Sequence, residues 1–188
     1  MLGQSHPSPS ELVQQLQSKK TTNKARDELL RLGKLDPEVQ QYLAAHLPRL
    51  IESGPSTADC QENSCETWLN AVKLAGQLKI AKAVPALVQW ISWRERGAPL
   101  GLSSEANLAF YPAATALWEI GNPAVPAVQH VLESDQRPGF RRIDERVLCI
   151  INTPESKAAL RDFLPRESDP DLQAWIKRCL GESPTVPG

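Results

Sequence analysis

The chain contains the phrase Ala83-Val84-Pro85-Ala86-Leu87-Val88-Gln89-Trp90-Ile91 and nearly repeats it as Ala124-Val125-Pro126-Ala127-Val128-Gln129-His130-Val131-Leu132. The two phrases begin 41 residues apart, at positions 83 and 124. A fixed period of about 20 to 50 residues is typical of repeat proteins, in which each unit buries its apolar face only against its neighbours. The repeat therefore predicts a solenoid.

Outside the repeated phrase, apolar residues also recur at helical spacing, and no alternating pattern of a strand continues beyond a few residues. We expect Gly33 to end the second helix and Pro48 to bend or interrupt the third. The expected helices cover residues 9–18, 23–32, 37–51, 66–79, 81–93, 105–120, 123–132, 141–151, 154–164 and 170–180.

The pattern of helices predicts an all-α fold, an α-solenoid of stacked antiparallel helix pairs. Helices joined by a few residues lie antiparallel, and each pair leaves an apolar side that the next pair covers. We expect an N-terminal lead with a short helix over residues 1–21, a single domain of about four helical pairs over residues 22–181, and a flexible tail over residues 182–188.

The phrase Asn122-Pro123-Ala124-Val125-Pro126-Ala127-Val128 resembles the start of the second helix in HEAT-type repeats, especially the bacterial HEAT-like repeats that also occur in bilin lyases. The resemblance covers residues 22–181 and carries a packing pattern more than a function. It implies that the second helix of each pair lines a concave surface. A partner would then contact the exposed positions of residues 81–93, 123–133 and 154–164.

Composition narrows the classes of partner. The 188 residues include 21 Lys and Arg against 22 Asp and Glu, and the net charge of −1 argues against nucleic acid, whose phosphates need clustered basic residues. No apolar run reaches the length of about 20 residues that spans a bilayer. We therefore expect an unidentified protein or peptide as partner, and a monomer.

Two clusters are candidates for binding that partner. Trp90, Trp93, Arg94 and Arg96 combine the side chains that dominate binding hot spots, although tryptophans at this spacing also fit the core between repeats. The candidate partner-binding residues are Trp90, Trp93, Arg94, Arg96, His130, Arg142 and Arg146.

The second cluster, Arg142 and Arg146, shares a helical face because its members are four residues apart. This cluster forms either an anion site or a solvated face, and we favour the solvated face. Asp144 and Glu145 would dilute its positive charge, and Arg141 can pair with Glu145 at the same spacing.

The cysteines leave three interpretations open for one pair. Cys60 and Cys65 can form a disulfide, remain thiols or supply half of a metal site. A disulfide would favour an exported mature domain over a cytoplasmic protein, and we lean slightly towards the exported origin. Cys149 and Cys179 are expected to be small apolar residues of the core.

These features predict a non-catalytic interaction module or scaffold that uses its concave face. We expect no enzyme activity and no cofactor, because no nucleophile–base pair or metal-ligand cluster accompanies the repeat. The alternatives are a HEAT-like enzyme, similar to a bilin lyase or a DNA glycosylase, and a segment of a larger multidomain scaffold. The charge balance argues against the glycosylase.

Overall fold

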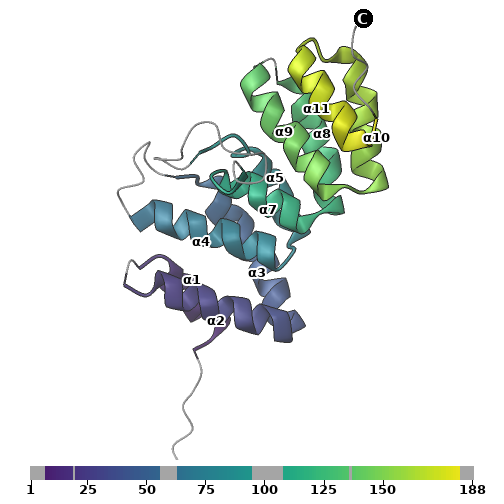
Figure 1. Cartoon of the computed structure of the whole chain (residues 1–188). Coiled ribbons are helices and arrows are strands. Elements are labelled where there is room, and N and C mark those ends of the chain that lie inside the picture. The colour runs from purple at the N-terminus through teal and green to yellow at the C-terminus, as the bar shows by residue number, and fades with distance from the viewer. Residues whose placement is uncertain (1–6, 19, 56–62, 95–107, 136, 183–188) are drawn as a thin grey trace, which may run out of the picture. The chain divides into compact units, whose positions relative to one another are not determined.

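The computed structural model describes residues 7–18, 20–55, 63–94, 108–135 and 137–182, and all secondary structure in these ranges is helical (Figure 1). The all-α prediction is therefore confirmed for the described residues. Three elements are short 3-10 helices: η1 (Ala81–Ala83), η2 (Asn122–Ala124) and η3 (Leu164–Arg166). The α-helices are α1 (Pro9–Leu16), α2 (Thr22–Leu35), α3 (Pro37–Glu52), α4 (Asn63–Gln77), α5 (Val84–Val88), α7 (Pro112–Ile120), α8 (Val125–Ser134), α9 (Pro138–Ile151), α10 (Pro154–Phe163) and α11 (Pro170–Leu180).

The chain folds as two compact units, Met1–Leu87 and Val88–Gly188. In the first unit, α1 packs against α2, while α2, α3 and α4 pack against one another. The expected lead over residues 1–21 thus contributes α1 to the first unit, and the expected domain over residues 22–181 crosses the border between the units. The stacking of all helix pairs into one solenoid stays a prediction.

Side-chain caps begin four of the helices at the positions that the sequence indicates. The Ser8 hydroxyl accepts a hydrogen bond from the Glu11 amide, and Asp36, Thr153 and Asp169 cap α3, α10 and α11 in the same manner. A cap satisfies an amide that has no partner within its helix, and its loss costs about 1 kcal/mol. Local sequence therefore determines where these helices start.

Helix α2 continues through Gly33, so the expected helix stop at this residue is wrong. A Cβ atom at Gly33 would lie 2.8 Å from Leu78 Cδ1, which shows that the glycine allows the Leu78 side chain to approach α2 closely. Helix α3 likewise continues through Pro48 to Glu52, and the proline does not interrupt it.

Both copies of the repeated phrase begin with the same local structure. A 3-10 turn ends at Ala83 and at Ala124, and an α-helix begins at the next residue, with φ and ψ of −52° and −48° at Val84 and −53° and −49° at Val125. The copies diverge after six residues. Helix α5 ends at Val88, not near Trp93 as expected, and the Ile91 amide donates to the Val88 carbonyl in a turn.

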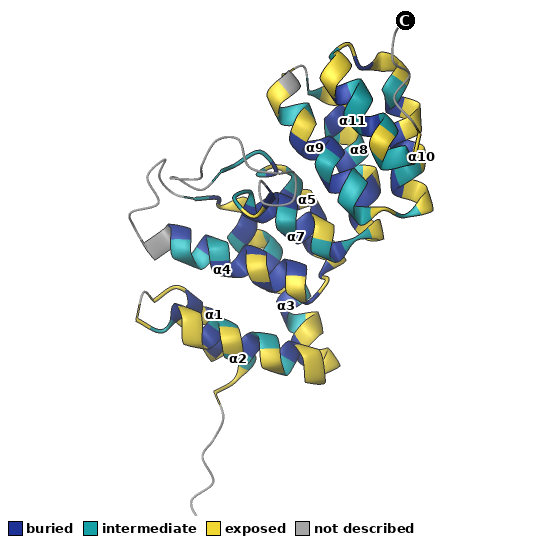
Figure 2. Cartoon of the chain, in the orientation of Figure 1, coloured by how far each residue is buried: buried dark blue, intermediate teal, exposed yellow. Residues whose placement is uncertain are grey.

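Helix α9 is the central helix of the second unit. It packs against α7, α8, α10 and α11, and it buries Ile143, Val147 and Leu148 among them. Figure 2 shows that the helices of each unit turn buried residues towards one another and keep exposed residues on their outer faces. The buried residues of α9 form one side of the helix, and its other described positions are half-buried or exposed.

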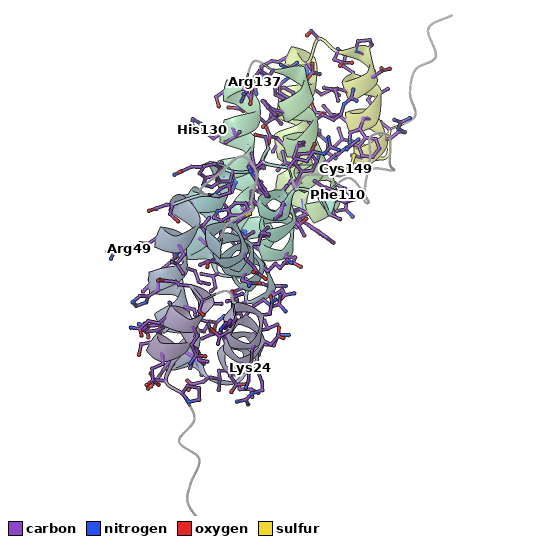
Figure 3. The ribbon with its side chains drawn as sticks, turned by 90° about the vertical axis from the view of Figure 1, so that its left-hand side faces the viewer. Lys24, Arg49, Phe110, His130, Arg137 and Cys149 are labelled. Atoms are coloured by element: carbon purple, nitrogen blue, oxygen red, sulfur yellow. A yellow bond between two sulfur atoms is a disulfide. The ribbon has the colours of Figure 1, made fainter. Side chains whose placement is uncertain are left out.

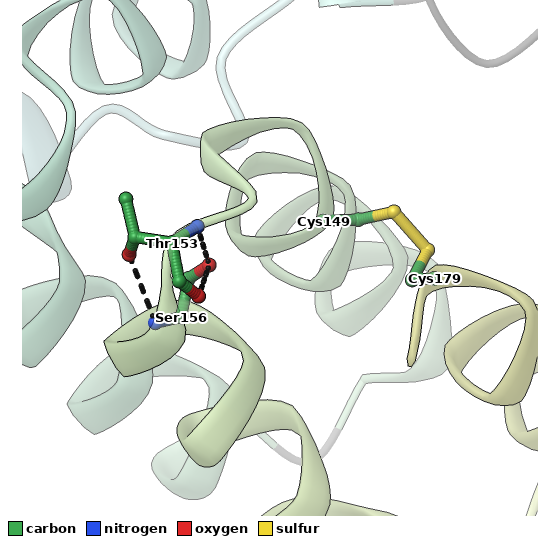
Figure 4. The surroundings of a disulfide bond; sticks show 4 residues. All are labelled: Cys149, Thr153, Ser156 and Cys179. Carbon is green, nitrogen blue, oxygen red and sulfur yellow. Dashed lines mark hydrogen bonds between the residues drawn. A yellow bond between two sulfur atoms is a disulfide. The ribbon is translucent and has the colours of Figure 1, made fainter. Parts of the chain in front are cut away.

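A disulfide joins α9 to α11, between Cys149 and Cys179 (Figure 4). Both residues are half-buried. The expectation that they are reduced core thiols is wrong. Sequence spacing gave no sign of the bond because 30 residues separate the cysteines, and only the packing of α11 on α9 brings their Cα atoms to 5.5 Å.

We expect removal of this disulfide to destabilise the second unit. In the chain-entropy view, a bond that closes a loop of about 30 residues stabilises the folded state by about 3 to 4 kcal/mol. The variant with Cys149→Ser and Cys179→Ser should lose about this free energy of unfolding in urea denaturation. In this variant, dithiothreitol should have little further effect on the unfolding transition of the second unit. A urea midpoint equal to that of the parent would contradict the proposed stabilisation.

Candidate functional site

One stripe of α9 carries the exposed Arg142 and the half-buried Arg146. These residues are four apart, so they lie one above the other on the helix, and Cys149 continues the same face. Helix α11 lies beside this stripe, tied to it by the disulfide, and presents Trp175 and Arg178. The two helices together form a concave site.

This site is a pocket of about 210 Å³. We call it the arginine–tryptophan pocket. Its lining combines three guanidinium groups, one carboxylate, one aliphatic side chain and one indole: Arg142, Arg146, Asp171, Leu172, Trp175 and Arg178.

The indole of Trp175 holds two of the arginines. Arg146 Cζ lies 5.8 Å from the centroid of the Trp175 ring, and Arg178 Cζ lies 5.6 Å from it. A cation over an aromatic face is attracted by the electron-rich ring, at about 0.5–1 kcal/mol for exposed pairs. Two guanidinium groups are thus oriented before any ligand arrives.

The positive charge of the pocket is only partly compensated. Arg142 Nη2 lies 3.9 Å from Asp169 Oδ2, whereas Arg146 and Arg178 form no ion pair within the described part of the chain. Arg146 Nε and Trp175 Nε1 are buried and have no hydrogen-bond partner among the described residues. Burial, and next the charge of Arg142, lower the pKa of Arg146, so an anion in the pocket would relieve both costs.

The acidic residues that were expected to dilute this charge face the core instead. Asp144 and Glu145 are 1% and 0% exposed. The charge of Glu145 raises the pKa of Arg146, but it does not offset the lowering by burial and by the charge of Arg142. Arg141 pairs with Glu167, at 2.9 Å between Nη2 and Oε1, and not with Glu145. The expected pairing of Arg141 with Glu145 is therefore wrong, and the carboxylates that pair with Arg142 or line the pocket are Asp169 and Asp171.

The two buried carboxyl groups have altered acidity. Burial, and next the charge of Asp135, raise the pKa of Asp144 to about 8. Burial and the neighbouring Glu167 raise the pKa of Glu145 to about 8. Both carboxyl groups therefore stay protonated at pH values at which an exposed carboxyl group is ionised. Arg137 and Arg141 oppose these shifts but do not cancel them.

The remaining candidates lie elsewhere. His130 is exposed on α8, and Figure 3 shows it on the opposite side of the second unit from Cys149. Trp90, Trp93 and Arg94 are half-buried in the segment after α5 and do not line the pocket. Arg96 lies outside the described residues. Of the predicted binding residues, the structure brings Arg142 and Arg146 together in one site.

Sequence reasoning missed the contribution of α11. Trp175 and Arg178 are three residues apart on an amphipathic helix, the same combination of residue types that made Trp90 and Arg94 candidates. That signal was present in the sequence. The proximity of α11 to α9 was not, because it results from tertiary packing and from the disulfide.

The cysteine pair of the first unit is partly described. Cys65 is buried and disulfide-bonded, and Cys60, its expected partner, lies outside the described residues. Within the described ranges, no group of three or more His, Cys, Asp or Glu residues could hold a metal ion. No helix in these ranges has the length and apolar character needed to span a membrane.

Comparison with known proteins returned no matching family model, no matching curated protein and no matching solved structure.

The buried carboxyl groups predict a pH-dependent stability. A carboxyl whose pKa is about 4 in the unfolded chain and about 8 in the folded one binds more protons when folded, so stability falls as pH rises between these values. We expect Tm to fall by at least about 4 °C from pH 5 to pH 9, the change that about 1 kcal/mol gives in a unit of this size. Scanning calorimetry would measure it.

Two variants test the source of this dependence. Asp144→Asn combined with Glu145→Gln removes both titrations and should reduce the fall in Tm to less than half of the parent's. Asp162→Asn changes an exposed carboxyl on α10 and should keep the parent's dependence. If the double variant also keeps it, Asp144 and Glu145 are not its source.

Proposed function

We propose that this chain is a non-catalytic interaction module that binds a protein or peptide, and that the partner docks at the arginine–tryptophan pocket. The observation that carries the proposal is a pocket lined by three guanidinium groups and one indole, in which the two guanidinium groups nearest the indole form no ion pair within the described residues. Arginine and tryptophan are the residue types most enriched at binding hot spots.

The size of the pocket favours a macromolecular partner. Sites that enclose a whole small molecule measure about 300–1,000 Å³, and this pocket has about 210 Å³. It has room for one side chain of a larger partner. The arginines held over Trp175 also lose less conformational entropy on binding than unconstrained arginines do.

The chemistry of the lining supports binding over catalysis. The lining has no histidine, serine, threonine or cysteine that could act as base or nucleophile, and its one carboxylate, Asp171, lies among arginines. Such a set attracts and orients negative charge. It contains no nucleophile–base pair of the kind that covalent catalysis requires.

We also propose that the helices form HEAT-like repeats. The repeated phrase supports this, because it produces a 3-10 turn followed by an α-helix at both positions. The pocket, however, belongs to α9 and α11, which are not the helices that the resemblance assigns to a concave surface. In our proposal, the partner therefore contacts a different face from the expected one.

The disulfides support an exported protein. Cys149 and Cys179 are bonded to each other, and Cys65 is bonded as well. Structural disulfides form and persist in oxidising compartments. A partner should therefore be sought in extracts that have not been reduced.

A capture experiment tests the proposed function. The full chain is immobilised with its disulfides intact and exposed to soluble and envelope extracts of its source, and bound proteins are identified by mass spectrometry. We expect at least one protein to be retained by the parent and lost, by tenfold or more, from the variant with Arg146→Ala and Arg178→Ala. These changes remove both guanidinium groups held by Trp175.

Arg161→Ala is the matched control, since Arg161 is an exposed arginine of the second unit on α10 and does not line the pocket. It should retain the partner. The proposal is wrong if no retained protein distinguishes the double variant from this control while circular dichroism shows that both remain folded.

A further inference from the structure

We propose that the arginine–tryptophan pocket binds a single carboxylate, that of an acidic side chain presented by a peptide. This inference rests on the proposed function, because it names the group of the partner that enters the pocket.

The charge balance matches one negative charge. Three arginines line the pocket, while Asp171 lies in the lining and Asp169 lies 3.9 Å from Arg142. The arginines therefore exceed the two aspartates by one charge. A carboxylate neutralises this excess. A phosphate group carries about −1.5 to −2 at pH 7, and its additional charge would be repelled by the two aspartates.

The guanidinium groups suit the shape of a carboxylate. An arginine presents parallel N–H donors that match the two oxygens of a carboxylate, and such paired bonds are stronger and more specific than single ones. Trp175 holds Arg146 and Arg178, so their planes are constrained when the ligand arrives. The buried Arg146 Nε, which lacks a partner among the described residues, shows that the cation is not satisfied from within.

Repulsion between the arginines destabilises the empty pocket, so the binding of an anion is favoured. Arg142 and Arg146 lie on the same face of α9, and burial, followed by the charge of Arg142, lowers the pKa of Arg146. The acidic residues next to them in sequence, Asp144 and Glu145, are buried, and neither forms an ion pair with them. A carboxylate between the arginines converts this repulsion into attraction.

The apolar wall favours a side chain as the source of the carboxylate. Leu172 and Trp175 contribute aliphatic and aromatic surface to the lining. The methylene groups of a glutamate can pack against this surface while its carboxylate reaches the arginines. A C-terminal carboxylate is attached directly to the backbone and has no methylene spacer of this kind.

Four short peptides test the inference with the full, oxidised chain at about 150 mM salt. The first is an acetylated and amidated alanine pentapeptide with a central glutamate. In the second and third, glutamine or phosphoserine replaces the glutamate, and the fourth is the glutamine peptide with a free C-terminus. Binding is followed by NMR through the Nε–H signals of Arg146 and Arg178, assigned with the variants Arg146→Lys and Arg178→Ala.

We expect the glutamate peptide to shift both signals saturably, with a Kd at least tenfold lower than the Kd of either glutamine peptide. The phosphoserine peptide should bind no tighter than the glutamate peptide. Arg178→Ala changes an exposed residue and should weaken binding of the glutamate peptide tenfold or more. Arg146→Lys keeps the charge but loses the paired donors, and it should also weaken binding. Arg161→Ala should leave the Kd unchanged.

Several results would overturn the inference. Equal affinity for the glutamate peptide and the amidated glutamine peptide would show that the pocket does not recognise the negative charge. Tighter binding of the phosphoserine peptide would show that the pocket is a phosphate site. Preference for the free C-terminus would reassign the carboxylate to a chain end. If no peptide binds but a partner is captured that depends on Arg146 and Arg178, the carboxylate inference is refuted and the proposed function stands. If the glutamate peptide binds but no partner is captured, the proposed function is refuted and the carboxylate inference stands.

Discussion

The burial of α9 within the second unit determines most of what the pocket can do. Helices α7, α8, α10 and α11 pack against α9, which buries Ile143, Asp144, Glu145, Val147 and Leu148 and leaves Arg142 exposed. Neighbouring residues in the sequence therefore have opposite environments. Asp144 and Glu145 are buried and hold protons up to a pH of about 8, while Arg142 is exposed and Arg146 is half-buried in the lining of the pocket.

Because of this burial, Asp144 and Glu145 do not pair with Arg142 or Arg146 in the fold, and the charge of that arginine pair is compensated only in part, by Asp169 at 3.9 Å from Arg142. Arg141, the neighbour that could have joined it, is engaged by Glu167 through two hydrogen bonds, at 3.0 and 2.9 Å. The ion pair is nearly buried, with side chains 12% and 0% exposed. The Arg141–Glu167 pair connects α9 to the segment before α11. Arg141 is therefore not available to the pocket, and the arginines that α9 contributes to it are Arg142 and Arg146.

The sequence predicted the elements better than it predicted their contacts. Helix starts at Ser8, Asp36, Thr153 and Asp169 were predictable because a cap is a local interaction. The helix stop at Gly33 was wrong because the glycine serves a tertiary contact with Leu78, which no local pattern encodes. For the same reason the sequence contained Arg142 and Arg146 as candidates but gave no means of joining them to Trp175.

The disulfide links the stability of the second unit to the geometry of its pocket. Cys149 lies one turn beyond Arg146 on α9, and Cys179 directly follows Arg178 on α11. The covalent bond therefore joins the two helices next to the residues that line the pocket. A pocket between two helices keeps its shape only if the helices keep their spacing, and α11 buries two side chains, Leu172 and Ile176. In an oxidising compartment the bond fixes that spacing, so the arginines held by Trp175 are preorganised by the fold as well as by the ring.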